Sequence, residues 1–408
     1  MVRQFIGFDK RIYLLGFGWL VTSIGFAMVI PFLSIYFHTE LGMSMSAIGL
    51  FFGVTAVLRA VPQPMAGWLS DRFGRVRIMG WSQVLRSFTF AGVAYAMAQN
   101  AGFWVIGSII GLNYIFGAVL HPAANAMVAD IVAKEERIPA YAFLRITGNL
   151  GWAIGPAMGG FIAHVSYARL FFISALLAVF SGLVFLVLLK DVKSEKPVDV
   201  HAFKIKDIFN LSKDPLLFRH CLISLLLFLA VAQFIAPFSV YVTDNLNITK
   251  SQLGGIYFIN GFMVVVLQFF MSALFRNWKL TNQLILGAIN YAIVYFCLVF
   301  AGSYSHLIIF MVVMTLGEMI VSPPSVTIVA NLSPPTAYGR YMGVFGLFQM
   351  AGWSLGPTVG GILLDLFDHN PSHSWFVISG MALIAAALFY NLGRKLSPDV
   401  NSGLKAQV

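Results

Sequence analysis

A ten-residue pattern that occurs twice decides the fold of this chain. Its first copy reads Gly151-Trp-Ala-Ile-Gly-Pro-Ala-Met-Gly-Gly160, and its second copy, 201 residues later, reads Gly352-Trp-Ser-Leu-Gly-Pro-Thr-Val-Gly-Gly361. Each copy lies in the middle of a long apolar run. Recurrence at a fixed offset indicates a duplicated structural unit, so we expect two halves with one fold.

Two further alignments extend the duplication along the chain. At the offset of 201, His121-Pro-Ala-Ala-Asn-Ala-Met-Val-Ala-Asp130 corresponds to Ser322-Pro-Pro-Ser-Val-Thr-Ile-Val-Ala-Asn331. Closer to the start of each half, Leu41–Ser46 aligns with Leu246–Ser251 at an offset of 205.

The composition places the repeats in a membrane. Of the 408 residues, 59% are hydrophobic and 10% are charged, whereas soluble domains carry about 25% charged residues. A transmembrane helix needs about 20 apolar residues, and the chain contains twelve such runs. The predicted spans are 12–37, 46–69, 78–98, 103–129, 140–165, 170–189, 217–242, 251–274, 283–301, 306–330, 341–366 and 375–392.

The basic residues of the loops predict the orientation. One set of loops carries 21 Lys and Arg residues, and the other carries only Arg169 and Lys250. Loops rich in Lys and Arg stay on the cytoplasmic side. With twelve spans both termini lie on that side, so we expect both termini in the cytoplasm.

The domain boundaries follow from the duplication. We predict a first six-helix half at 1–189, a cytoplasmic linker at 190–216 and a second six-helix half at 217–408. Six spans per half make the two copies parallel, related by an axis along the membrane normal. Within the linker, Phe203, Ile208 and Phe209 alternate with lysines, which is compatible with either an amphipathic helix on the inner leaflet or a solvated connection.

The loop between the second and third spans carries a family resemblance. It reads Gly67-Trp-Leu-Ser-Asp-Arg-Phe-Gly-Arg-Val-Arg77 and resembles the loop motif of the major facilitator superfamily, whose halves are parallel six-helix repeats. The Gly–Pro pattern of span five resembles the motif of the superfamily's twelve-span drug–proton antiporter branch. The resemblance implies an all-α integral membrane protein of twelve transmembrane helices, with two parallel six-helix halves around a central cavity.

The resemblance also implies a gate in the loop motif, and the alternative is a cluster of charges that serves only the membrane topology. In the family, the corresponding contacts stabilise the outward-facing state. Here Arg75 can reach Asp130 at the end of span four, while Asp71 can cap span three. In the second half Arg276 and Asn331 stand at the comparable points, so the charge pair is not repeated. The predicted gating set is Gly67, Asp71, Arg72, Gly74, Arg75 and Asp130.

The repeated Gly–Pro pattern predicts close helix packing. Small residues let transmembrane helices approach each other, and a proline removes one backbone donor and permits a bend. These helices are either pivots of the transport cycle or ordinary packing surfaces. The residues concerned are Gly151, Gly155, Pro156, Gly159, Gly160, Gly356 and Pro357.

Ionisable residues inside the spans are the candidate site. Such residues are costly in hydrocarbon and usually functional. They are Arg59, Arg86, Arg145, Glu318 and, nearer a span end, His121. The arginines could contact an anionic substrate or orient polar partners, of which Asn113 and Asn149 are candidates. We expect Arg145 to face the central cavity rather than lipid, because it points away from the glycine face of its helix.

Glu318 is the one carboxylate deep within a span. A buried carboxylate can exchange protons near neutral pH, as proton coupling requires. The alternative is a permanent structural ion pair. Two features of the drug–proton branch are missing, an arginine in span four and an acid in span one.

These observations favour a secondary active transporter that works by alternating access. The leading hypothesis is proton-coupled multidrug efflux of lipophilic or cationic compounds, as an antiporter. A transporter of a small, possibly anionic metabolite or sugar is the alternative, followed by a channel or a non-transporting receptor. An enzyme is disfavoured, and we expect no metal and no cofactor besides the proton gradient. The expected partners are lipid, protons and a small molecule but no nucleic acid, for a monomer in a cell membrane, most simply a bacterial inner membrane.

Overall fold

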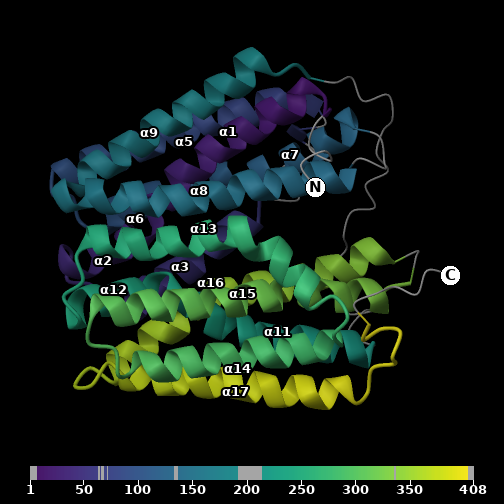
Figure 1. The fold of residues 1–408 in the computed structure, drawn as a ribbon. Helices are drawn as coiled ribbons and strands as arrows, with labels where there is room; N and C mark the ends of the chain where they lie inside the picture. Colours follow the sequence, from purple (N-terminus) through teal and green to yellow (C-terminus); the bar gives the residue numbers. More distant parts are fainter. Residues whose placement is uncertain are drawn as a thin grey trace. The chain divides into compact units, whose positions relative to one another are not determined.

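The computed structural model describes residues 7–62, 65, 69–70, 72–132, 137–191, 214–334 and 337–402. Regular structure in these residues is helical (Figure 1), apart from an isolated bridge between Lys279 and Ser402. The helices fall on all twelve predicted spans, which confirms the all-α fold with twelve transmembrane helices. Eight helical stretches in the described residues are long and apolar enough to cross a membrane by themselves.

The helices of the first half are α1 (Lys10–Ala27), α2 (Ile30–Thr39), α3 (Met45–Ala60), α5 (Arg75–Ala98), α6 (Phe103–Gly117), α7 (Leu120–Ile131), α8 (Arg137–Val165), α9 (Tyr167–Leu183) and the π-helical turn η3 (Val184–Leu188). Those of the second half are α11 (Pro215–Val231), the 3-10 turn η4 (Ala232–Phe234), α12 (Ala236–Asn245), α13 (Lys250–Leu274), α14 (Leu280–Leu298), α15 (Tyr304–Leu332), α16 (Tyr338–Leu366) and α17 (His373–Gly393).

The first span of each half is interrupted at corresponding places. Pro31 stands in the first turn of α2, and Pro237 stands in the first turn of α12. A proline suits a first helical turn because its missing N–H would lack a helical partner there anyway. The span therefore divides into two helices, α1 with α2 and α11 with α12, at the same point of both copies.

Helix contacts within the two halves repeat as well. In the first half α1 packs on α8 and α5 packs on α9, and in the second half α11 packs on α16 and α14 packs on α17. The chain forms two compact units. The first unit comprises Met1–Met43, Gly53–Val198 and Ile248–Val265, and the second unit comprises Ser44–Phe52, Asp199–Asn247 and Val266–Val408. The sequence-based boundaries at 189 and 217 stay a prediction, and the linker helix proposed at 201–216 lies outside the described residues as far as 213.

Glycines stand where the first and fifth spans of each half touch. A side-chain carbon on Gly155 would lie 2.8 Å from the Ile24 carbonyl oxygen, and one on Gly356 would lie 3.1 Å from the Leu229 carbonyl oxygen. These distances leave no room for a larger residue at either position. The glycines of the Gly–Pro pattern therefore let α8 pack on α1 and α16 pack on α11, and whether these helices also act as pivots stays a prediction.

Large apolar side chains cover much of the exposed surface. Trp104 is 82% exposed, Phe88 is 70% exposed and Leu366 is 71% exposed. In water such a surface would aggregate, whereas in a bilayer it faces lipid. Because lipid offers no hydrogen bonds, a spanning segment must satisfy its backbone groups within the protein, as the helices of the described residues do.

Two related contacts hold the start of the third span in each half. The Val76 N–H, in the first turn of α5, donates to Asp191 Oδ1 at 2.8 Å. At the offset of 205, the Thr281 N–H in the first turn of α14 donates to Asn401 Oδ1 at 2.9 Å. Gly74, just before α5, has a φ of 95°, which only glycine adopts easily. A charged side chain thus caps the helix in one half and a neutral amide caps it in the other.

The end of the fourth span also contacts these regions, which are the start of the third span in the first half and the C-terminal segment in the second half. Asp130 forms an ion pair with Arg75 at the start of α5. Its repeat counterpart Asn331 donates through Nδ2 to the carbonyl oxygens of Val400 at 3.1 Å and Ser402 at 3.2 Å. The second half therefore replaces the ion pair by hydrogen bonds to the C-terminal segment 400–402, here named the C-terminal clamp.

We expect Asn401→Ala to destabilise the second unit. The variant removes the acceptor from the α14 helix start and a second hydrogen bond from Asn401 Nδ2 to Thr281 Oγ1, and loss of a helix cap costs about 1 kcal/mol. Thermal unfolding of the purified protein should show a lower midpoint. Asn277→Ala, an exposed change in the neighbouring loop, is the control. Equal midpoints for the parent and Asn401→Ala would show that the clamp adds no stability.

Candidate functional site

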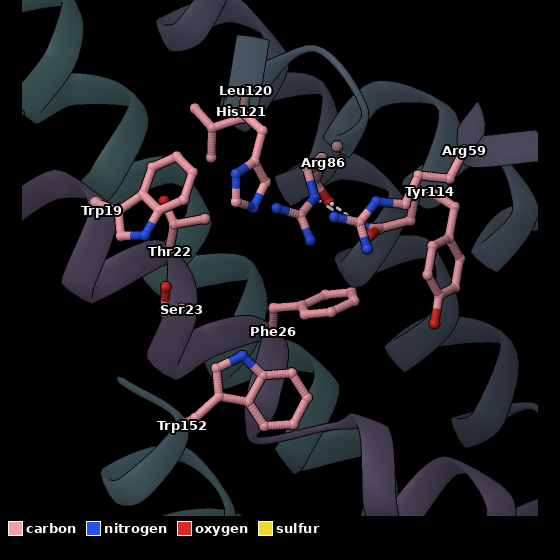
Figure 2. A pocket seen from close by; sticks show the side chains of 12 residues that line it. Trp19, Thr22, Ser23, Phe26, Arg59, Arg86, Tyr114, Leu120, His121 and Trp152 are labelled. Atoms are coloured by element: carbon pink, nitrogen blue, oxygen red, sulfur yellow. Dashed lines mark hydrogen bonds between the residues drawn. The ribbon is translucent and has the colours of Figure 1, made fainter. Parts of the chain in front are cut away.

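A pocket of about 130 Å³ lies within the first unit (Figure 2). It is bounded by helices α1, α3, α5, α6, α7 and α8. The lining residues are Trp19, Thr22, Ser23, Phe26, Arg59, Arg86, Asn113, Tyr114, Gly117, Leu120, His121 and Trp152. Three of the ionisable residues that the sequence singled out, Arg59, Arg86 and His121, are thus brought together.

Arg86 is the most enclosed of the three, with 5% of its surface exposed. Its Nε donates to Asn113 Oδ1 at 3.2 Å. Asn113 in turn donates through Nδ2 to Thr89 Oγ1 at 2.7 Å and to the Arg86 carbonyl oxygen at 3.3 Å. The guanidinium carbon lies 5.2 Å from the ring centre of Phe26 and 5.4 Å from that of Phe90. These contacts fix the position of the guanidinium group.

The guanidinium group of Arg86 packs against Gly117, whose missing side chain makes room for it. A side-chain carbon on Gly117 would lie 3.2 Å from Arg86 Nε. Any larger residue at this point of α6 would press on the guanidinium group. The local sequence of α6 therefore matches the placement of the buried cation on α5.

Arg59 and His121 complete a polar wall around Arg86, in which the two arginines carry the positive charge. Figure 2 shows both guanidinium groups and the imidazole ring gathered on one side of the Phe26 ring. Arg59 and Arg86 are close enough to repel each other. The His121 ring meets the Trp19 ring edge to face at 4.3 Å. None of the lining residues that the structure describes carries a carboxylate.

Aromatic rings form the opposite side of the pocket. The Phe26 ring meets Tyr114 at 5.8 Å and Trp152 at 6.4 Å, both edge to face. Figure 2 shows Phe26 and Trp152 below the charged groups and Trp19 to one side. The pocket therefore combines positive charge with flat apolar surfaces, and it can bind a compound that has both a polar end and a ring.

Glu318 is not a lining residue of this pocket, and it belongs to α15 in the second unit. It is half-buried, and its charge interacts with Tyr291 of α14. At the offset of 201, Glu318 corresponds to Gly117, and at the offset of 205, Tyr291 corresponds to Arg86. The repeat thus holds a cation beside a glycine in one copy and a carboxylate beside a tyrosine in the other.

The remaining candidates of α8 do not line the pocket. Arg145 is exposed and Asn149 is half-buried. The expectation that Arg145 faces a central cavity stays a prediction. Asn113, considered as a partner of the arginines, is confirmed in contact with Arg86.

In the loop motif, Arg75 and Asp130 form the predicted ion pair, and both side chains are mostly buried, at 11% and 13% exposure. Arg72 is exposed and lies 5.5 Å over the Phe73 ring. Gly67 and Asp71 lie outside the described residues. The pair connects α5 with α7 inside the first unit.

Sequence reasoning missed Phe26 and Trp152 as lining residues. Trp152 stands inside the repeated pattern, where its counterpart Trp353 packs near Phe228 and Phe234 in the second unit. The repeat of this tryptophan was the available signal for Trp152. Nothing in the sequence distinguishes Phe26 from the other phenylalanines of the chain, which has 38.

Known proteins resemble this chain over nearly its whole length. It is 26% identical to the uncharacterized MFS-type transporter YqjV of Bacillus subtilis (strain 168), covering 90% of this chain and 89% of that protein. It is 24% identical to the quinolone resistance protein NorA of Staphylococcus aureus (strain MSSA476), covering 89% of this chain and 92% of that protein.

Solved structures share the fold. A bacterial homologue of the human lysosomal transporter Spinster superposes with a TM-score of 0.77 at 14% identity, covering 95% of this chain and 98% of that one. A peptide transporter POT with bound sulfate superposes with a TM-score of 0.79 at 14% identity, covering 98% and 97%.

The sequence profile of the Major Facilitator Superfamily matches residues 15–304 and 221–406 of this chain. Together these ranges span both copies of the repeat, in which the helix contacts described above recur. The chain belongs to the Major Facilitator Superfamily, and it is a multi-pass membrane protein that transports a small molecule rather than an enzyme.

Proposed function

We propose that this secondary transporter exports lipophilic organic compounds by alternating access, driven by proton antiport. The observation that carries the proposal is the pocket of the first unit, where Trp19, Phe26, Tyr114 and Trp152 offer ring surfaces beside polar groups. Pockets that take organic molecules combine mostly apolar walls with a few placed polar groups. Similarity to a quinolone resistance protein and the Gly–Pro pattern support export.

The sequence favoured lipophilic or cationic drugs as substrates, and the positive charge of the pocket argues against the cationic ones. Arg59 and Arg86 would repel a cation at this end, so the pocket favours neutral or anionic compounds. A small anionic metabolite is the second candidate, because about 130 Å³ is less than the roughly 300–1,000 Å³ of pockets for drug-sized ligands.

Glu318 is the proposed proton carrier. It is a half-buried carboxylate on a membrane-spanning helix, and such groups form proton relays in transporters. The proposal places both termini in the cytoplasm of a bacterial cell, with the protein acting as a monomer, as the distribution of basic loop residues and the family suggest.

We expect Glu318→Gln to abolish transport driven by a pH gradient, because the amide mimics the protonated carboxyl permanently. Proteoliposomes loaded with a pH dye, with norfloxacin as the fluorescent substrate, measure both fluxes. The variant should lose at least about 10-fold of proton-driven flux, which corresponds to about 1.4 kcal/mol, while exchange without a pH gradient persists.

Asp368→Asn, an exposed carboxylate beyond the end of α16, is the matched control and should behave as the parent. If Glu318→Gln drives norfloxacin uphill at the parental rate, Glu318 is a structural group. Absence of any flux through the parent protein, for norfloxacin and for neutral lipophilic dyes, would contradict the export proposal itself.

We expect Arg75→Ala to lower transport severalfold at an equal amount of protein in the membrane, because the variant leaves the Asp130 carboxylate without its ion-pair partner. Breaking a buried pair by removing one partner costs about 3–5 kcal/mol. Exchanging the two residues, as Arg75→Asp with Asp130→Arg, should restore part of the activity. Arg77→Ala, an exposed neighbour, should have no effect. A swap no better than the single variant would argue against the pair as a gate.

A further inference from the structure

We infer that the pocket of the first unit binds the carboxylate end of an aromatic or lipophilic organic acid. Arg86 and Arg59 would hold the acid group, and the rings of Phe26 and Trp152 would contact the apolar body. The inference rests on the proposed function, because it names the class of compound that the transporter carries.

The first argument is the uncompensated charge. Arg59 and Arg86 belong to membrane-spanning helices of the first unit. Among the described residues, ion pairs join Arg11 to Asp9 and Arg75 to Asp130, and neither Arg59 nor Arg86 has a carboxylate partner there. A cation without a counter-charge is costly in a low-dielectric site. Two cations that repel each other raise that cost, and an anion bound between them would lower it.

The second argument is the free capacity of a fixed donor group. Arginine has five N–H donors. Among the described residues, Asn113 Oδ1 accepts from Nε of Arg86 at 3.2 Å, and Gln83 Oε1 lies 3.5 Å from Nη1. The other donors of Arg86 remain available on the side of the pocket, to which Figure 2 shows the guanidinium group turned. A guanidinium fork matches the two oxygens of a carboxylate.

The third argument is size. The pocket volume of about 130 Å³ suits an acid group with one small ring system better than a whole drug-sized molecule, which needs roughly 300 Å³ or more. Trp19 and Trp152 on α1 and α8 offer faces for such a ring. The pocket therefore recognises one end of the compound and leaves the rest of it outside these twelve residues.

A purely structural role is the competing explanation. The rings of Phe26 and Phe90 already stabilise the Arg86 cation, and the group could remain there without a ligand. This explanation predicts no preference among ligands of different charge, and it assigns no part to Arg59. The two explanations therefore differ in a binding measurement.

The experiment compares three probes that share one ring system. The full-length protein in phosphatidylcholine nanodiscs is dialysed against tritiated 2-naphthoate, with empty nanodiscs as the blank. Unlabelled 2-naphthamide and 2-naphthylmethylammonium serve as the neutral and cationic competitors. We expect naphthoate to bind at least 10-fold more tightly than the amide and the ammonium compound to compete least.

Variants assign the preference to the pocket. Arg59→Gln and Arg86→Gln should each weaken naphthoate binding at least 10-fold and leave naphthamide binding unchanged. Arg86→Lys, which keeps the charge but loses the fork, should fall between Arg86→Gln and the parent. Arg169→Gln, exposed at the start of α9 in the same unit, is the matched control. Arg59→Gln decides the matter if the buried Arg86 variants do not fold.

Equal affinities for naphthoate and naphthamide, or parental naphthoate binding by Arg59→Gln, would overturn the inference. The proposed function is tested separately by flux. Export of neutral lipophilic dyes without any preference for naphthoate would leave the proposed function standing and remove this inference. A naphthoate preference in nanodiscs without flux in proteoliposomes would support this inference and contradict the proposed function.

Discussion

The close contact between α1 and α8 is the constraint on which the rest of the first unit depends. Gly151 and Gly155 permit it, since any side chain there would meet the backbone of α1. The contact brings Phe26 of α1 near Trp152 of α8 and so forms the apolar side of the pocket around Arg86. Packing without side chains is how transmembrane helices approach closely in lipid, where the hydrophobic effect does not draw them together.

Duplication has kept the packing of the two halves and changed their charges. The contacts of α1 with α8 and of α5 with α9 recur as α11 with α16 and α14 with α17. The charges at corresponding positions differ, with Arg86 matched by Tyr291 and Gly117 matched by Glu318. Under the proposals above, the first unit would serve an anion and the Glu318 carboxylate of the second unit would serve a proton. A transporter that couples two solutes needs such a difference between its copies.

The fold could be predicted from the sequence because lipid requires long apolar helices and the repeat marks equivalent ones. Arg59, Arg86 and His121 were also visible, since an ionisable residue in an apolar run is rare. The sequence did not show that these three side chains line one pocket, because that depends on the rotation of each helix about its axis and on breaks such as the one before Leu120. Phe26 could not be chosen among 38 phenylalanines, and neither Arg145 nor Glu318 lines the pocket.

The contacts that hold the start of the third span differ between the two units in what the loss of one partner leaves behind. In the first unit the holding contacts include the Arg75–Asp130 ion pair and the Asp191 carboxylate. In the second unit they are hydrogen bonds of the neutral Asn331 and Asn401. Arg75 and Asp130 are mostly buried, so a substitution that removes either side chain leaves a charge without its counter-charge in a poorly solvated place, which is costly. A lost partner of Asn331 or Asn401 leaves only a neutral amide, so this end of the second unit should tolerate sequence divergence better than the same end of the first unit.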